Sequence, residues 1–391
     1  MKKTLLIFLF VSSIITAQIN TEVHVFDISK IGENYILENG KNISNNKGYD
    51  SQPFFYSANN VIFSSSRNGN TDIVIYNLND EKKRFISNTK KGGEYSPQRI
   101  PNSKDISAVR LDGNGLQRFY KYDFKTGKDK EIISNLKVAY PNWFNKNIVV
   151  ASVIVNDSLH LIVSDLKQKT NTTVAKNVGR SLHKIPNTVL MSFVSKEKKD
   201  YWLLKSINPE TKEIKTITSL GKYEDVTWLP NGILLISKSE AIYKFNPQKD
   251  KKPSLFFSFL DENINNISRI SVNKSSTKLA LVAEVSPKYL AEEQLKAYND
   301  RDIEAFLKPF AKDVKVYWYP NNLSYEGIDK MREKYASFFN NTPDLHCKVL
   351  KRIVHKNQVI DHELVTVNGR TFKAVAIYTM KNGKIASVTF M

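Results

Sequence analysis

The stretch SANNVIFSSSRNGNTDIVIYNLND, residues Ser57 to Asp80, joins two apolar runs through a polar turn. The first run begins at Val61 and the second at Asp72. Runs rich in Val, Ile, Phe and Tyr that are bounded by Asn, Gly and Ser are typical of adjacent β-strands. The stretch therefore predicts a β-hairpin.

Runs comparable to VIFSSS recur at intervals of about 41 to 46 residues, which suits the four-stranded blade of a β-propeller. A short strand and a turn precede each run, and the first five are followed by a third and a fourth strand. Five blades are thus complete, whereas the sixth has two strands before the pattern changes at Ser286 and Pro287. The six runs begin at Val61, Ile106, Ile148, Val189, Ile233 and Leu279.

Two strand-like runs near the N-terminus have no blade of their own. They are VHVFDI from Val23 and NYILENGKNIS from Asn34. We expect residues 22–45 to complete the last blade, because a closed ring leaves few exposed sheet edges.

These repeats resemble those of the TolB-like six-bladed propellers, with WD40-like repeats, over about 265 residues by pattern. The resemblance implies an all-β six-bladed propeller, spanning residues 18–286, that binds partners at the mouths of a central channel. No GxSxG motif occurs in this region, and His24, His160 and His183 lie far apart in the sequence. Binding is therefore favoured over hydrolysis for this module.

The N-terminus MKKTLLIFLFVSSIITAQ has the layout of a secretory signal, with Lys2 and Lys3 before an apolar run from Leu5 to Ile15. The run is shorter than the roughly 20 residues that a membrane-spanning helix needs. We expect residues 1–17 to be a signal peptide cleaved near Ala17, which predicts a periplasmic or secreted bacterial protein that does not span the membrane.

The amino-acid composition limits the kinds of partner that the protein is expected to bind. The 391 residues carry a formal net charge of +19 and a single cysteine, Cys347, which excludes an internal disulfide scaffold. The basic residues are scattered, with runs no longer than Lys82 to Arg84, rather than gathered in a patch. This favours a solvated surface without a nucleic-acid partner. Weak attraction to acidic glycans or lipid headgroups is the alternative.

After Pro287 the periodicity becomes helical. YLAEEQLKAYNDRDIEAFLKPF forms an apolar face that Asp300 to Asp302 divide into two helices, and GIDKMREKYASFFNN predicts a third. A strand, VKVYWYP, lies between them, and four strands finish the chain. Helices first and a long antiparallel sheet last predict an α+β module over residues 287–391.

This order resembles the SnoaL-like branch of the nuclear transport factor 2 superfamily from Lys288 to Met391. The resemblance implies a cone-shaped domain whose interior is a pocket, used for isomerisation, cyclisation, dehydration, ligand binding or dimerisation. The three positions used by steroid isomerases depart from that pattern, being occupied by Tyr319, Gln294 and, near the third, Ala376. The steroid reaction is therefore not expected.

Polar and aromatic side chains are candidates to line the pocket. Asp361 and Glu363 share one face of their strand, whereas His362 takes the other. The favoured expectation is that both carboxylates face solvent or a partner subunit. In the alternative they are buried in the cone, where burial would raise the carboxyl pKa and allow general acid or base chemistry. The spacing of the histidines matches no metal motif, and no metal or cofactor is predicted. The expected ligand-binding residues are Tyr317, Trp318, Tyr319, Tyr335, His346 and Tyr378.

Two functions follow. The first is an exported binding or interaction protein rather than an enzyme, whose propeller engages a protein or glycan while the C-terminal cone holds a small hydrophobic ligand or mediates homodimerisation. The alternative is a SnoaL-type isomerase, cyclase or hydrolase acting on a small hydrophobic carbonyl substrate, with Asp361 or Glu363 as base and a tyrosine as hydrogen-bond donor.

Overall fold

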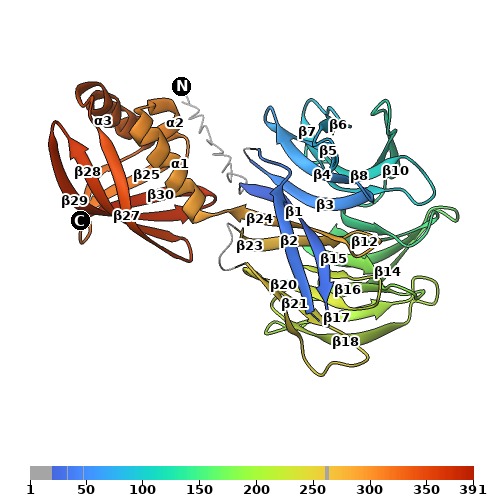
Figure 1. Ribbon diagram of the computed structural model, residues 1–391. Coiled ribbons are helices and arrows are strands. Elements are labelled where there is room, and N and C mark those ends of the chain that lie inside the picture. The colour runs from blue at the N-terminus through green and yellow to red at the C-terminus, as the bar shows by residue number, and fades with distance from the viewer. Residues whose placement is uncertain (1–19, 33, 47, 260–263) are drawn as a thin grey trace, which may run out of the picture.

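The computed structural model describes residues 20–32, 34–46, 48–259 and 264–391, so the predicted signal peptide lies outside the described residues. Six four-stranded units form a β-propeller, and an α+β module follows it (Figure 1). The predicted fold class, an all-β six-bladed propeller followed by an α+β cone-shaped domain, is confirmed.

The first five blades each consist of four strands that are consecutive in the chain. A single parallel bridge between Thr71 and Gly93 links the sheets of blades 1 and 2. The strands are β3 (Asp50–Ser57), β4 (Asn60–Arg67), β5 (Asn70–Asn77) and β6 (Lys83–Phe85) in blade 1; β7 (Gly92–Arg99), β8 (Ile106–Asp112), β9 (Gln117–Tyr122) and β10 (Asp129–Ile133) in blade 2; β11 (Val138–Trp143), β12 (Ile148–Val155), β13 (Ser158–Asp165) and β14 (Thr170–Ala175) in blade 3; β15 (Val178–Lys184), β16 (Met191–Ser195), β17 (Trp202–Ile207) and β18 (Ile214–Gly221) in blade 4; and β19 (Val226–Trp228), β20 (Leu234–Lys238), β21 (Ala241–Phe245) and β22 (Ser254–Ser258) in blade 5.

Blade 6 combines strands from both ends of the repeat region, in the order β2-β1-β24-β23. The outer two are β1 (Thr21–Ile31) and β2 (Asn34–Asn42), and the inner two are β23 (Ile264–Val272) and β24 (Lys278–Val285). β1 runs antiparallel to β24, with Val23 opposite Val282. The N-terminal segment thus supplies half of this sheet.

The second strand of a blade is apolar on both faces because both faces are buried between neighbouring blades. In β4, Val61 and Phe63 pack against blade 6, whereas Ile62, between them, packs against blade 2. Among the described residues, equivalent hydrophobic clusters also join blades 2 and 3, 3 and 4, 4 and 5, and 5 and 6. Burial between neighbours therefore explains why these runs do not alternate between apolar and polar residues.

The C-terminal module contains one six-stranded sheet in the order β26-β25-β30-β29-β28-β27, with three helices. The side chain of Asp302 accepts a hydrogen bond from the backbone N–H of Ala305, which caps α2 and explains the break between the first two helices. The elements are α1 (Pro287–Asp300), α2 (Ile303–Leu307), β25 (Phe310–Trp318), β26 (Asn322–Glu326), α3 (Ile328–Asn341), β27 (His346–His355), β28 (Gln358–Val367), β29 (Arg370–Lys381) and β30 (Lys384–Phe390).

Two details of this sheet differ from the expected antiparallel arrangement. β25 pairs with β30 in parallel, because the last strand returns beside the first. The short edge strand β26 was not predicted, since its mostly exposed residues show no apolar alternation. Across the described parts of both modules, the helices are too short or too polar to cross a bilayer.

The packing of β1 gives a test of its structural role. Val23 is fully buried between blades 6 and 1, so Val23→Ala should lower the free energy of unfolding by about 2 kcal/mol. Val189→Ala, the same substitution at a site that is 63% exposed, should change it by less than about 0.5 kcal/mol. Urea denaturation of both variants measures the difference; equal stabilities would show that the β1 segment is a dispensable linker.

Candidate ligand-binding site

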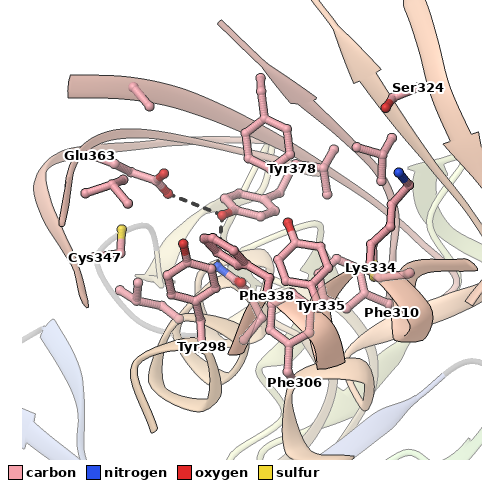
Figure 2. A pocket seen from close by; sticks show the side chains of 18 of the residues that line it. Tyr298, Phe306, Phe310, Ser324, Lys334, Tyr335, Phe338, Cys347, Glu363 and Tyr378 are labelled. Carbon is pink, nitrogen blue, oxygen red and sulfur yellow. Dashed lines mark hydrogen bonds between the residues drawn. The ribbon is translucent and has the colours of Figure 1, made fainter. Parts of the chain in front are cut away.

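A cavity of about 420 Å³ lies inside the C-terminal module, between the sheet and the helices (Figure 2). Most of the side chains that line it are aromatic or aliphatic, and the only two that are ordinarily charged are Glu363 and Lys334. The lining residues are Gln294, Leu295, Tyr298, Phe306, Phe310, Val316, Trp318, Ser324, Tyr325, Met331, Lys334, Tyr335, Phe338, Cys347, Glu363, Val365, Phe372, Ala374, Tyr378, Val388, Phe390 and Met391.

Aromatic rings from all three helices build one wall. Phe306 of α2 and Tyr335 of α3 have ring centroids 4.4 Å apart. Tyr298 of α1 lies 6.4 Å from Tyr335 and also contacts Phe338. Because the three helices meet through these rings, the shape of the cavity depends on packing between helices as well as on the sheet.

A chain of polar groups crosses the interior. The hydroxyl of Tyr378 donates a 3.3 Å hydrogen bond to Glu363 and accepts one of 2.9 Å from the side-chain amide of Gln294. All three residues are buried. Buried polar groups need such partners, so the chain holds these side chains in fixed positions.

Burial raises the pKa of Glu363 to about 7, and the negative charge of Asp361 acts in the same direction, whereas the hydrogen bond from Tyr378 opposes the shift. Burial likewise raises the pKa of Cys347 to about 12, which keeps its thiol protonated. Burial also raises the pKa of Tyr298 and Tyr335. Glu363 is therefore the group in this wall that can change its protonation state near neutral pH.

Asp361 shares the inner face of β28 but does not line the cavity. Its two oxygens accept hydrogen bonds of 2.7 Å each from Arg352, and its side chain is fully buried. Arg352 also pairs with Glu292 of α1 at 3.1 Å. Arg352 thus links this carboxylate of the sheet to α1, and Asp361 does not face a ligand in the cavity.

The opposite side of the cavity is more open. In Figure 2, Lys334 and Ser324 lie away from Glu363, beyond the aromatic side chains. Lys334 is exposed, with its ammonium 5.4 Å from the ring centroid of Tyr325. Trp318, which also lines the cavity, is 58% exposed and its ring lies 5.8 Å from that of Phe390. The site thus has a buried acidic end and an exposed basic end.

The structure brings together Trp318, Tyr335, Tyr378 and Glu363 of the residues expected at the site. Tyr317, Tyr319, His346 and Asp361 do not contribute to the lining. The reason is strand alternation for two of them: Tyr317 stands between the lining residues Val316 and Trp318, and His346 precedes Cys347. Tyr319 follows the end of β25 and is 59% exposed.

Sequence reasoning did not select Tyr298, Cys347 or Lys334 for the site. Tyr298 could have been found, because Leu290, Gln294 and Tyr298 are spaced four residues apart on α1 and so share one face. Cys347 entered the sequence analysis only as a single cysteine that excludes an internal disulfide. No comparable pattern marks Lys334.

Within the ranges that the structure covers, no three His, Cys, Asp or Glu side chains gather as they would around a metal ion.

The family model described as "SnoaL-like domain" matches residues 291–388, and the C-terminal module is a SnoaL-like domain. A putative TolB from Agrobacterium tumefaciens superposes on the N-terminal region with a TM-score of 0.54 at 10% identity, covering 68% of this chain and 99% of that chain. The N-terminal module therefore has the same propeller fold as that protein.

Smaller solved structures match the C-terminal module alone. A cystatin fold protein from Novosphingobium aromaticivorans is 23% identical, covers 27% of this chain and 98% of its own, and has a TM-score of 0.27. An NTF2-like protein of unknown function from Cytophaga hutchinsonii is 19% identical, with coverages of 28% and 91% and a TM-score of 0.25. No curated protein matches the chain.

The raised pKa of Glu363 predicts a pH-dependent stability of this module. Between the ordinary value of 4.5 and about 7, the unfolded chain loses the proton that the folded chain keeps, so stability falls as the pH rises through this window. Glu363→Gln should remove this fall and leave the variant more stable than the wild type by about 3 kcal/mol at pH 8.

Cys347 is the only cysteine and is buried, so its reaction with a pyridyl disulfide reports unfolding of the module in urea. Glu333→Gln, on the exposed face of α3, is the matched control and should keep the pH dependence of the wild type. Identical pH dependence in wild type and Glu363→Gln would contradict the assignment.

Proposed function

We propose that the mature chain is an exported binding protein, periplasmic or secreted, with residues 18–286 and 287–391 acting as two units. The C-terminal cavity would hold a small hydrophobic ligand, and the propeller would engage a protein or glycan partner. The observation that carries the proposal is the 420 Å³ aromatic cavity, whose volume lies in the range of small-molecule sites.

The polar groups of the cavity support binding more than catalysis. Acid and base catalysis on one substrate calls for groups that exchange protons with it. Asp361 is held in a bidentate pair with Arg352, and Glu363 and Tyr378 are already hydrogen-bonded to each other. These contacts fix a donor and acceptor pattern in advance, which lowers the entropic cost of holding a ligand.

The chemistry of the lining also limits the ligand. Its body must be apolar, because the rings of Phe306, Phe338 and Phe372 cannot satisfy polar groups. One polar group can meet Glu363 at the buried end. An anionic group at the other end would lie near the ammonium of Lys334. An amphipathic molecule with an apolar centre satisfies all three conditions.

A cavity-filling substitution tests ligand binding. Ala374 lines the cavity from β29, and Ala374→Phe should weaken binding of the apolar anion anilinonaphthalene sulfonate at least about tenfold by occupying its space. Val375→Phe, whose side chain points to the other face of the same strand, should leave binding unchanged. Fluorescence titration measures both; equal affinities in the two variants would place the dye outside the cavity.

Catalysis by an isomerase, cyclase or hydrolase on a small hydrophobic carbonyl substrate is a second candidate, favoured by one observation. Glu363 lies in the cavity wall with a pKa of about 7, so half of it is a base at neutral pH. Its carboxylate would remove a proton beside the carbonyl carbon, while the hydroxyl of Tyr298 or Tyr335 would donate a hydrogen bond to the carbonyl oxygen. Asp361 would only tune Glu363 through its charge.

This candidate predicts that the protein accelerates deuterium exchange at the carbon beside the carbonyl of an apolar ketone, with a rate that rises as the pH passes through about 7. Glu363→Gln should reduce the rate about 100-fold or more, and Asp361→Asn much less. Nuclear magnetic resonance follows the exchange. Absence of acceleration across a panel of ketones would reject the enzyme.

Homodimerisation through the C-terminal domain belongs to the same proposal. Ile353 and Val354 of β27 are 61% and 45% exposed, and Leu350 on the same strand is 38% exposed. These side chains lie on both faces of β27, which is the edge strand of its sheet, so the edge of the sheet is the candidate contact between two copies. Native mass spectrometry of the mature protein reads its mass, assembly state and any bound small molecule together.

A further inference from the structure

A second cavity, of about 620 Å³, lies in the propeller, lined by residues of the first strands of all six blades. These strands are β3, β7, β11, β15, β19 and β23, which surround the central channel. The lining differs from that of the C-terminal cavity because it carries six charged side chains, five of them basic. They are Arg99, Arg180, Lys184, Asp225, Arg269 and Lys274, together with His183.

The backbone of these first strands is irregular where it meets the cavity. The pairing of β3 with β4 shifts between Ser51 and Phe54, and that of β7 with β8 shifts between Tyr95 and Gln98. Within the two shifts, Gln52 and Ser96 adopt φ values of 58° and 53°, and each is followed by a proline. Such bulges redirect side chains and interrupt the row of backbone donors that an added peptide strand would need.

Two arginines from different blades converge on one buried carboxylate. Arg180 of β15 donates to both oxygens of Asp225, at 3.1 and 2.6 Å, and Arg269 of β23 donates to one of them at 2.8 Å. Asp225 is only 8% exposed and immediately precedes β19. Blades 4, 5 and 6 are thus tied together at the cavity wall by one carboxylate between two guanidinium groups.

This arrangement holds the arginines without neutralising them. Glu224 also contacts Arg180, at 3.3 Å, but it is shared with Lys196 at 2.9 Å. Gly179 makes that approach possible, since a side chain there would come within 2.6 Å of Glu224. Counting the two arginines and Lys196 against Asp225 and Glu224 leaves one net positive charge.

The remaining cations add to that charge. Arg99, Lys184 and Lys274 also line the cavity, which therefore presents five cationic side chains and one carboxylate. Burial lowers the pKa of Lys184, and the nearby ammonium of Lys274 lowers it further. Two like charges that repel each other are stabilised when an anion lies between them.

Arg269 has donors to spare for such an anion. Among the described residues its hydrogen bonds leave from Nη1 alone, to Asp225 and to the carbonyl of Ser268. The guanidinium also lies 5.6 Å from the ring centroid of Tyr140, which supports its orientation. A guanidinium fixed in this way binds carboxylate or phosphate oxygens with little loss of side-chain entropy.

We propose that the channel cavity is a binding site for a small multivalent oxyanion, such as a polycarboxylate, held by Arg180, Arg269 and the two lysines. The site is separate from the C-terminal cavity and goes beyond the function proposed above. The cavity volume suits a small molecule, and the bulged, proline-containing strands disfavour an acidic peptide added as an extra strand.

Calorimetric titration of the mature protein with citrate tests the proposal, with inorganic phosphate and a hexaglutamate peptide as parallel ligands. We expect citrate to bind with a millimolar or tighter Kd that weakens as salt is added. Tighter binding of phosphate than of citrate would also support an oxyanion site and would assign it to phosphate-bearing ligands. Binding of the peptide alone, or of none of the three, would overturn the proposal.

Matched variants locate the site. Lys274→Gln removes an exposed side chain, and Arg269→Gln leaves Asp225 paired with Arg180, so both should fold, and each should weaken citrate binding at least about tenfold. Arg84→Gln, on the outermost strand of blade 1, makes the same change in net charge and should have no effect. Ala374→Phe should also have none, which separates this site from the C-terminal cavity. Unchanged affinity in both Lys274→Gln and Arg269→Gln would contradict the assignment.

Discussion

Burial of each propeller sheet on both faces is the constraint on which the rest of the structure depends. A second strand such as β4 has no solvent face, so each blade requires a neighbour on either side. The linear repeat alone would leave blade 6 with two strands and an open edge. Insertion of β1 between β2 and β24 removes that edge and supplies Val23 and Val25 to the cluster that joins the last blade to the first. Hydrogen bonds also join neighbouring blades. The indole N–H of Trp143 donates to Ser107 of the preceding blade at 2.8 Å, and that of Trp228 donates to Ser192 of the preceding blade at 2.9 Å.

The C-terminal module meets a different requirement, because its sheet surrounds a space instead of closing on a second sheet. Its interior therefore keeps polar groups that a filled core would exclude, and these groups must satisfy one another. Two neighbouring carboxyl groups therefore have different environments. Glu363 accepts a hydrogen bond from Tyr378, which is itself bonded to Gln294, whereas Asp361 pairs with Arg352. Asp361 is compensated by a guanidinium, whereas burial without a cationic hydrogen-bond partner raises the pKa of Glu363 to about 7.

The fold could be predicted from the sequence because its signals are local and repeated. The recurrence of the apolar runs indicates the buried strand of each blade, and the helical spacing after Pro287 indicates the buried face of each helix. The sites were less predictable. Strand parity correctly placed Asp361 and Glu363 on one face, but Arg352 reaches Asp361 only through a register that shifts between Val349 and Lys351. The Arg180, Asp225 and Arg269 cluster joins residues from three blades, and no local pattern in the sequence specifies that contact. Long-range partners of charged groups depend on register and bulges, which short motifs do not encode.

The pairing of β1 with β24 in blade 6 also determines how the propeller would respond to a pulling force. Asn20 and Val285 lie side by side, with the backbone N–H of Val285 donating to the carbonyl of Asn20 at 3.3 Å, and α1 begins two residues later. The first residues of the propeller and the root of the second module are therefore at the same end of two antiparallel strands (Figure 1). Tension between a tethered N-terminus and a captured C-terminal module would separate β1 from β24 one hydrogen bond at a time, like a zipper, instead of shearing the whole ladder at once. Such a geometry yields at low force and would open the ring at blade 6 first.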